Sequence, residues 1–312
     1  MMLARVADSL YWTGRYVERA EHISRLAAVM LNATLDRTDA GAQAAHIALT
    51  AVGERDPARL GQAVEAARAL VLAREDAGSV LVSLARAREN ARQVRDQITT
   101  ETWERLNLLY LRVTGADAEA AFADDAASFL AEIIADLHLF KGAADATMSH
   151  GEGWRFMLTG VYIERAQLMA RLLETCFADG ARAVSDHIAL MSLLRMGCAL
   201  EPYLRAYTAD INPRYILEFL LFDEDFPRSI RFSTERIEEH LAHLSHRLER
   251  DRAEALRLAG RLNARLKFAD AEEVGVSGAG QLLGAVADEC ASIHEAIWDT
   301  FVAYPLELSL PA

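Results

Sequence analysis

The chain has 312 residues, of which 52% are hydrophobic and only 6 are proline, so it can bury a large core and suits a bundle of helices. Its formal net charge of −13 at pH 7 argues against nucleic acid or an anionic membrane surface as the main partner. No run approaches the roughly 18 uncharged apolar residues of a membrane span, so none is predicted.

Apolar residues recur with the period of a helix, and no strong period-2 run appears, so the chain is predicted to be all-α. Caps and breaks predict helices in the first half at 3–34, 46–53, 59–74, 76–113 (broken near 99–100) and 119–149. In the second half they predict helices from 154 onward, then at 186–207 (broken at 201–202), 214–222, 228–247, 251–268 and 282–302. The Gly-rich stretch Ala269–Gly280 is predicted to be a loop.

One long stretch of the chain occurs twice. Leu10–Met30, LYWTGRYVERAEHISRLAAVM, is followed 146 residues later by Phe156–Cys176, FMLTGVYIERAQLMARLLETC. Both contain the pattern T-G-x-Y-[V/I]-E-R-A-x-x-x-x-R-L. A repeat with this period indicates two copies of a multi-helix unit. We therefore predict one helical bundle over residues 1–312, built from two pseudo-symmetric repeats, 1–150 and 151–312, that share a core.

The repeated helix is apolar on nearly every face, which is typical of a buried helix, yet it carries charges. Glu21 and Arg25 have the favourable i,i+4 spacing for an ion pair. Arg19 and Arg165 project about 100° away from the glutamate that precedes each of them, so each must find a partner outside its own helix. Either the two copies pair their charges across a pseudo-twofold axis, or the charges line an anion or carboxylate site. The two interpretations are compatible.

A weaker correspondence lies further along each copy. Arg92 and Arg95 align with Arg228 and Arg231, so that an arginine pair follows each Glu-Arg helix. Arginine at such points can pair with the buried glutamates or hold a phosphate or carboxylate in two hydrogen bonds. The candidate site therefore comprises Glu18, Arg19, Glu21, Arg25, Arg92, Arg95, Glu164, Arg165, Arg171, Arg228 and Arg231.

Other chemistries fit the sequence poorly. No histidine has a glutamate three residues before it, which argues against a di-metal carboxylate site. His240, His243 and His246 drift around a helix and are interpreted as a solvated face. The three cysteines are scattered and lie in apolar patterns, and the N-terminal stretch has early charges rather than a secretory signal. We expect a cytoplasmic protein without a metal or cofactor.

Several segments together resemble the bacterial alpha-E family, an all-helical family named for its ER motif. These are the two Y-[V/I]-E-R-A sequences, ARENARQVRD at Ala87–Asp96 and FLLFDEDFPRSIRF at Phe219–Phe232. The resemblance covers essentially the whole chain; one departure is that the position of Glu21 becomes Gln167. Members are typically encoded beside, or fused to, a circularly permuted ATP-grasp ligase and often a transglutaminase-like cysteine peptidase. This context implies a role in forming or processing amide bonds.

Three functions remain as alternatives. The chain is a non-catalytic partner of the ATP-grasp ligase, presenting its Glu/Arg groove to the ligase or to a peptide substrate. Alternatively, it is an acyl or aminoacyl transferase in which Glu18 or Glu164, with a raised pKa, acts as general base. The third alternative is a structural homodimer with a sealed ionic core. The lack of a well-placed nucleophile beside Glu18 favours the first.

Overall fold

The computed structural model describes residues 2–35, 39–53, 63–178, 186–207, 210–246, 253–269 and 271–303. Every regular element within these ranges is a helix, and they contain no strand, so the all-α prediction is confirmed. None of the helices described is long and apolar enough to cross a bilayer. Cys176, Cys198 and Cys290 are all free, and burial raises the pKa of Cys290 to about 12.

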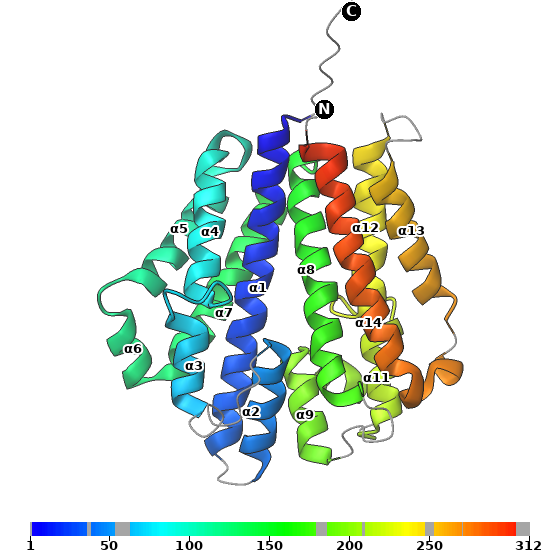
Figure 1. Ribbon diagram of the computed structural model, residues 1–312. Helices are drawn as coiled ribbons and strands as arrows, with labels where there is room; N and C mark the ends of the chain where they lie inside the picture. Colours follow the sequence, from blue (N-terminus) through cyan, green and yellow to red (C-terminus); the bar gives the residue numbers. More distant parts are fainter. Residues whose placement is uncertain are drawn as a thin grey trace, which may run out of the picture.

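Two long helices, α1 (Ala4–Leu35) and α8 (Glu152–Phe177), lie side by side at the centre of the molecule (Figure 1). They contain the two copies of the repeated sequence. Glycine allows their backbones to touch, because a Cβ on Gly14 would overlap the carbonyl oxygen of Met157, and one on Gly160 would overlap that of Tyr11. This reciprocal contact fixes the register of the two helices.

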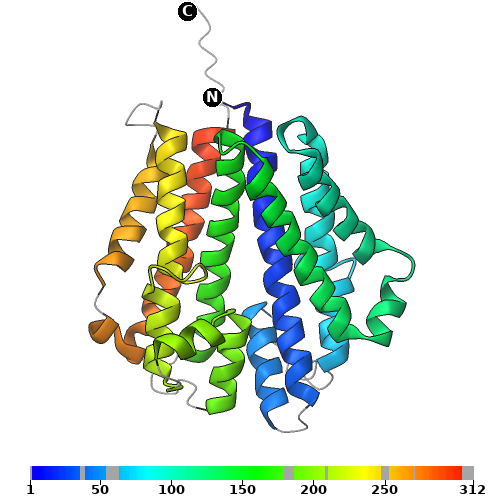
Figure 2. The same cartoon turned by 180° about the vertical axis from the view of Figure 1, so that it is seen from behind.

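The helices of residues 39–147 pack mainly on the α1 side. They are α2 (Asp39–Ala51), α3 (Ala63–Leu72), α4 (Val80–Gln93), α5 (Thr100–Thr114), α6 (Ala118–Asp124) and α7 (Ala126–Thr147), with a short 3-10 turn, η2 (Arg95–Gln97), before α5. Seen from behind, α7 crosses α1 diagonally (Figure 2). This crossing places side chains of α7 against the charged part of α1.

The remaining helices pack mainly on the α8 side (Figure 1). They are α9 (His187–Met196), α10 (Leu200–Ala206), α11 (Pro213–Phe222), α12 (Ile230–Ser245), α13 (Glu254–Lys267) and α14 (Ala271–Ile297), followed by a π-helical turn, η5 (Trp298–Val302). Buried residues of both flanks and of the central pair belong to one continuous hydrophobic cluster.

Local sequence signals explain where several helices begin. The side chain of Asn212 accepts a hydrogen bond from the backbone N–H of Arg214, and Pro213 opens α11, as predicted. Thr99 caps α5 at the predicted break. The predicted helix 119–149 is wrong in being continuous, because Asp125 ends α6 and caps α7 through Ser128.

Two other predictions require correction. The break between α9 and α10 falls at Gly197–Ala199 rather than at Glu201-Pro202, because proline is tolerated in the first turn of α10. The stretch predicted as a Gly-rich loop forms the start of α14, with a kink at Gly275, whose φ is 51°. Two further expectations from the sequence lie outside the described residues: Asp56-Pro57 as the N-cap and first proline of the helix predicted at 59–74, and a loop over 179–185.

Candidate functional site

The two Glu-Arg dipeptides pair across the central helices, one turn beyond the glycine contact. Arg165 Nε and Nη2 donate to the two oxygens of Glu18 at 2.7 and 2.9 Å. Arg19 Nε donates to Glu164 Oε1 at 2.6 Å. Each arginine therefore finds its partner outside its own helix, as the helical geometry predicted, and that partner lies on the other central helix.

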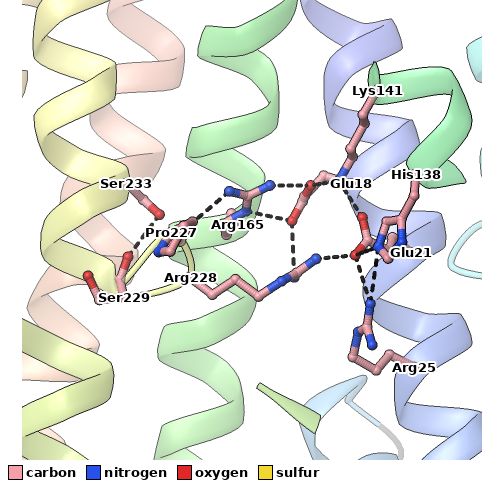
Figure 3. A network of polar contacts seen from close by, with 10 residues as sticks. All are labelled: Glu18, Glu21, Arg25, His138, Lys141, Arg165, Pro227, Arg228, Ser229 and Ser233. Atoms are coloured by element: carbon pink, nitrogen blue, oxygen red, sulfur yellow. Dashed lines mark hydrogen bonds and ion pairs between the residues drawn. The ribbon is translucent and has the colours of Figure 1, made fainter. Parts of the chain in front are cut away.

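The Glu18 side of this arrangement is a closed ionic network (Figure 3). Lys141 of α7 binds both Glu18 and Glu21. Arg228, which lies just before α12, also contacts both carboxylates. Arg165 uses its remaining terminal nitrogen to donate to the carbonyl oxygen of Pro227 at 2.9 Å. The network thus joins α1, α7 and α8 to the segment that precedes α12.

Further partners surround Glu21, whose side chain is fully buried. Arg25 donates to it at 3.0 Å, which confirms the predicted i,i+4 pair. His138 Nε2 lies 3.2 Å from the same carboxylate oxygen. With Lys141 and Arg228, four side chains contact one carboxylate, and this leaves it no exposed edge for a ligand.

The ionisation of these carboxylates follows from their partners. Burial opposes the charge of Glu18, but the positive charges of Arg165, Lys141 and Arg228 outweigh it and lower the pKa well below its usual value. Burial likewise opposes the charge of Glu164, and Arg15 and Arg19 lower its pKa. The prediction of a raised pKa at Glu18 or Glu164 is therefore wrong. Neither group has the basicity of a general base near neutral pH.

The Glu164 side is built differently. Arg15 Nε and Arg19 Nε each donate to one oxygen of Glu164, both at 2.6 Å. Arg15 Nη2 also donates to the side-chain oxygen of Gln167 at 2.7 Å. Gln167 occupies the position equivalent to Glu21, so here an amide replaces a carboxylate. On this side, two arginines therefore share a single carboxylate.

A cavity of about 940 Å³ opens beside Glu164. Side chains of α1, α4 and α8 supply its arginines, and α2, α3 and the turn before α4 contribute to the rest of the lining. The charged and amide side chains that line it are Arg15, Arg19, Glu65, Asp76, Arg86, Glu164, Gln167 and Arg171. Apolar side chains such as Ile23, Leu70 and Leu168 complete the lining.

Three arginines of this wall have unused hydrogen-bond donors. Beyond its Nε bond to Glu164, Arg19 makes no hydrogen bond to another described residue. Arg86 and Arg171 form no hydrogen bond or ion pair with the described part of the chain. The guanidinium groups of Arg19 and Arg86 lie over the ring of Tyr16, 5.5 and 5.7 Å from its centroid. Tyr16 therefore positions two cations at the cavity without consuming their N–H groups.

The structure brings together most of the predicted site residues, but in two separate places. The network contains Glu18, Glu21, Arg25, Arg165 and Arg228, and the cavity is lined by Arg19, Glu164 and Arg171.

Three predicted residues lie elsewhere. Arg92 is exposed and pairs with Glu89 on its own helix, and Arg95 lies over the ring of Trp103. Arg231 pairs with Glu224 and Glu235. Of the two aligned arginine pairs, only Arg228 reaches the buried glutamates, so the interpretation of Arg92 as its equivalent is wrong.

Sequence reasoning missed the residues that complete both places. Lys141 carried a detectable signal, since it is one of only two lysines in a chain otherwise rich in arginine. Arg15 aligns with Val161 in the second copy, so comparison of the two copies did not indicate Arg15 as a site residue. Arg86, Glu65 and Asp76 lie outside the repeated stretch. The described residues include no cluster of three or more metal-ligating side chains.

His240 also differs from expectation. It is buried rather than solvated, and stacks on Tyr162 with ring centroids 5.9 Å apart. Arg155 contacts its Nδ1 at 3.2 Å. Burial, together with the charge of Arg155, lowers the pKa of His240 to about 4. Its role is therefore in packing α12 against α8.

The fold and site define an all-helical bundle whose two central helices exchange Glu–Arg pairs and border an arginine-lined cavity. The chain belongs to the Alpha-E family: the family model, described as a predicted alpha-helical domain with a conserved ER motif, matches residues 2–302. Glu18-Arg19 and Glu164-Arg165 are the two Glu-Arg dipeptides on those helices.

Curated relatives occur in mycobacteria. Uncharacterized proteins of Mycobacterium bovis and Mycobacterium tuberculosis (strain CDC 1551) are each 29% identical to this chain over 351 aligned positions. A further one, from M. tuberculosis strain H37Rv, is 28% identical. The match covers 98% of this chain but only 37% of each relative, so the chain spans little more than a third of their length. No solved structure matches it significantly.

Proposed function

We propose that this protein is a non-catalytic, substrate-presenting component of an ATP-grasp amide-ligase system. In this role the cavity beside Glu164 holds a group of the substrate, and the helical body presents it to the ligase. The circularly permuted ATP-grasp ligase is the proposed partner, with the transglutaminase-like protein as a second component of the same system.

The chemistry of the cavity lining carries this proposal. Among the described residues that line it there is no serine, threonine, cysteine, histidine, lysine or tyrosine. Its carboxylates are Glu164, which two arginines hold ionised, and the exposed Glu65 and Asp76. The lining is thus rich in groups that bind an anion and poor in groups that attack a carbonyl. This favours binding over an acyl or aminoacyl transferase reaction.

Two further observations support a partner protein. The family resemblance implies genes adjacent to, or fused with, the ligase. The mycobacterial relatives are also much longer than the matched region, which leaves room in them for additional domains. The helical protein and the ligase could work together whether they are fused in one chain or expressed as separate proteins.

Co-purification tests this function. The tagged chain is expressed together with the ATP-grasp ligase encoded nearest to it, and ATP hydrolysis by the ligase is measured with and without the chain. We expect a stable complex and a change in ATP turnover that depends on the chain. Absence of both would refute the role.

The network around Glu18 supports an additional, structural role for that half of the ionic system. Its two carboxylates are buried and bind cations from several helices, an arrangement that would fix the register of those helices. A homodimer remains a separate alternative, and sedimentation of the purified chain at several concentrations distinguishes it from a monomer.

We also propose that the bundle arose by duplication of a unit corresponding to residues 1–150 and 151–312. The reciprocal contacts of Gly14 and Gly160 support this origin, as do the exchanged pairs Glu18–Arg165 and Glu164–Arg19.

A further inference from the structure

We propose that the cavity binds a short peptide with free ends, its carboxylate against the arginine wall and its ammonium group toward Glu65 and Asp76. The inference rests on the proposed substrate-presenting function and names the substrate class. It follows from the arrangement of charge around the cavity.

The arginine wall suits a carboxylate. Arg19 keeps both terminal nitrogens available because its Nε alone holds Glu164. Arg86 and Arg171 add two guanidinium groups that form no hydrogen bond or ion pair with the described part of the chain. A planar guanidinium can donate two parallel hydrogen bonds to one carboxylate, and such charge-assisted pairs are the stronger class of hydrogen bond.

The acidic side of the cavity suits an ammonium group. Glu65 is in the first turn of α3, and Asp76 is in the turn between α3 and α4. Asp76 Oδ1 accepts the backbone N–H of Gly78 at 2.8 Å, and its second oxygen has no partner in the described structure. Glu65 forms no ion pair with a described residue. Two carboxylates are therefore available in the lining, on α3 and in the turn before α4 rather than on the helices that carry the arginines.

The balance of charge disfavours a polyanion. Four arginines and three carboxylates line the cavity, which leaves a formal net charge of only +1. A nucleotide triphosphate would place several negative charges near Glu164, Glu65 and Asp76. A zwitterion matches positive and negative groups separately and leaves no large excess of charge.

Size and apolar lining indicate a peptide rather than a single ion or amino acid. Small-molecule sites commonly enclose roughly 300–1,000 Å³, and at about 940 Å³ this cavity is at the upper end. Ile23, Leu70 and Leu168 add apolar surface to the same lining. That surface suits the side chains of a peptide whose two ends reach the opposite charges.

Equilibrium dialysis of the full chain tests the inference. The probe is a mixture of di-, tri- and tetrapeptides of L-amino acids with free ends, and mass spectrometry quantifies the peptides retained on the protein side. Parallel samples use the same mixture amidated at the C-terminus or acetylated at the N-terminus, and ATP alone. A protein concentration ten times the Kd gives about tenfold enrichment of a bound peptide by mass action. We expect such enrichment for free peptides and a large loss on capping either end.

Matched variants locate the binding. Arg86→Gln combined with Arg171→Gln should abolish retention, because both side chains are exposed and can change without disturbing the core. Asp76→Asn with Glu65→Gln should remove the preference for a free N-terminus. Arg257→Gln is the control, since Arg257 is an exposed arginine that pairs with Glu254 away from the cavity. It should bind like the wild type.

Several results would overturn the inference. They are no enriched peptide, equal retention of free and capped peptides, equal retention by the Arg86/Arg171 variant, or retention of ATP in place of peptides. Each is independent of the ligase. A chain that binds the ligase but no peptide refutes only the ligand, whereas a chain that binds peptides but no ligase refutes only the partnership.

Discussion

Arg165 and Glu18 form a two-point ion pair between helices that are far apart in sequence, with N–O distances of 2.7 and 2.9 Å. Only 1% of the Glu18 side chain is exposed, and 11% of that of Arg165. Burial on its own would lower the pKa of Arg165, but the charge of Glu18 raises it above its usual value. The pair therefore remains ionised inside the bundle, and its integrity depends on both members.

Replacing Arg165 with leucine should destabilise the protein strongly. The change leaves Glu18 buried with fewer compensating charges and leaves the carbonyl of Pro227 without its donor. Breaking a buried pair costs about 3–5 kcal/mol. Urea unfolding should therefore show a loss of free energy of unfolding of that order.

Arg92→Leu is the matched control for this prediction. Arg92 is more than half exposed and pairs with Glu89 on its own helix surface. Its replacement should leave the free energy of unfolding close to that of the wild type. Equal stabilities of the Arg165 and Arg92 variants would contradict the burial argument.

Gly14→Ala and Gly142→Ala should change stability in opposite directions. A methyl group on Gly14 meets the backbone of α8 and forces the central helices apart, which should cost about 1–3 kcal/mol or more. Gly142 lies within α7 with nothing near its Cβ position, so alanine there should stabilise the helix by about 0.5–1 kcal/mol. Differential scanning calorimetry measures both. A Gly14→Ala variant that melts at or above the wild-type temperature would exclude the close backbone contact.

The central ionic pairs could be predicted from the sequence because helix geometry alone decides that Arg19 and Arg165 cannot reach their neighbouring glutamates. Because the Glu-Arg sequence occurs twice, the glutamate of one copy was a candidate partner for the arginine of the other. Lys141 could not be placed, because its role depends on the angle at which α7 crosses α1, and neither helix encodes that angle locally (Figure 2).

The cavity was likewise beyond sequence reasoning. Its volume depends on how far α3 and the turn before α4 stand from the central helices. The exposed Arg171 and Arg86 look like ordinary surface residues until that distance is known. The false equivalence of Arg92 and Arg228 has a related cause, since a short alignment does not record which helix lies opposite.

Stability should decline as the pH falls below about 6.5. Burial, with the charge of Arg155, lowers the pKa of His240 to about 4 in the folded protein. An unfolded histidine takes up a proton near pH 6.5. Between these values the unfolded chain binds more protons, so stabilisation present above pH 6.5 is lost towards pH 4. Burial also lowers the pKa of His22 to about 4 and adds to this slope.

The carboxylates of Glu18 and Glu164 extend the loss of stability to lower pH. Because the folded pKa of Glu18 and Glu164 is lowered, their contribution is present above the unfolded value near 4.3 and disappears as the pH falls further. Urea unfolding at pH 7.5, 5.5 and 4.5 measures the profile. His240→Phe, which keeps an aromatic ring against Tyr162, should reduce the slope between pH 6.5 and 4. An unchanged slope would show that His240 takes up its proton equally in both states.

Gln167→Glu should separate stability from ligand binding. The new carboxylate would lie beside Arg15, whose Nη2 already donates to the Gln167 side-chain oxygen at 2.7 Å, so the fold should be retained. The same change removes the net positive charge of the cavity lining and places a second carboxylate beside Glu164. We expect a melting temperature at or above that of the wild type and at least a tenfold loss of retained free-ended peptide in the dialysis measurement. Gln93→Glu, at an exposed position on α4, is the control for added charge. Undiminished peptide retention by Gln167→Glu would place the carboxylate site away from Arg15 and Glu164, whatever its effect on melting.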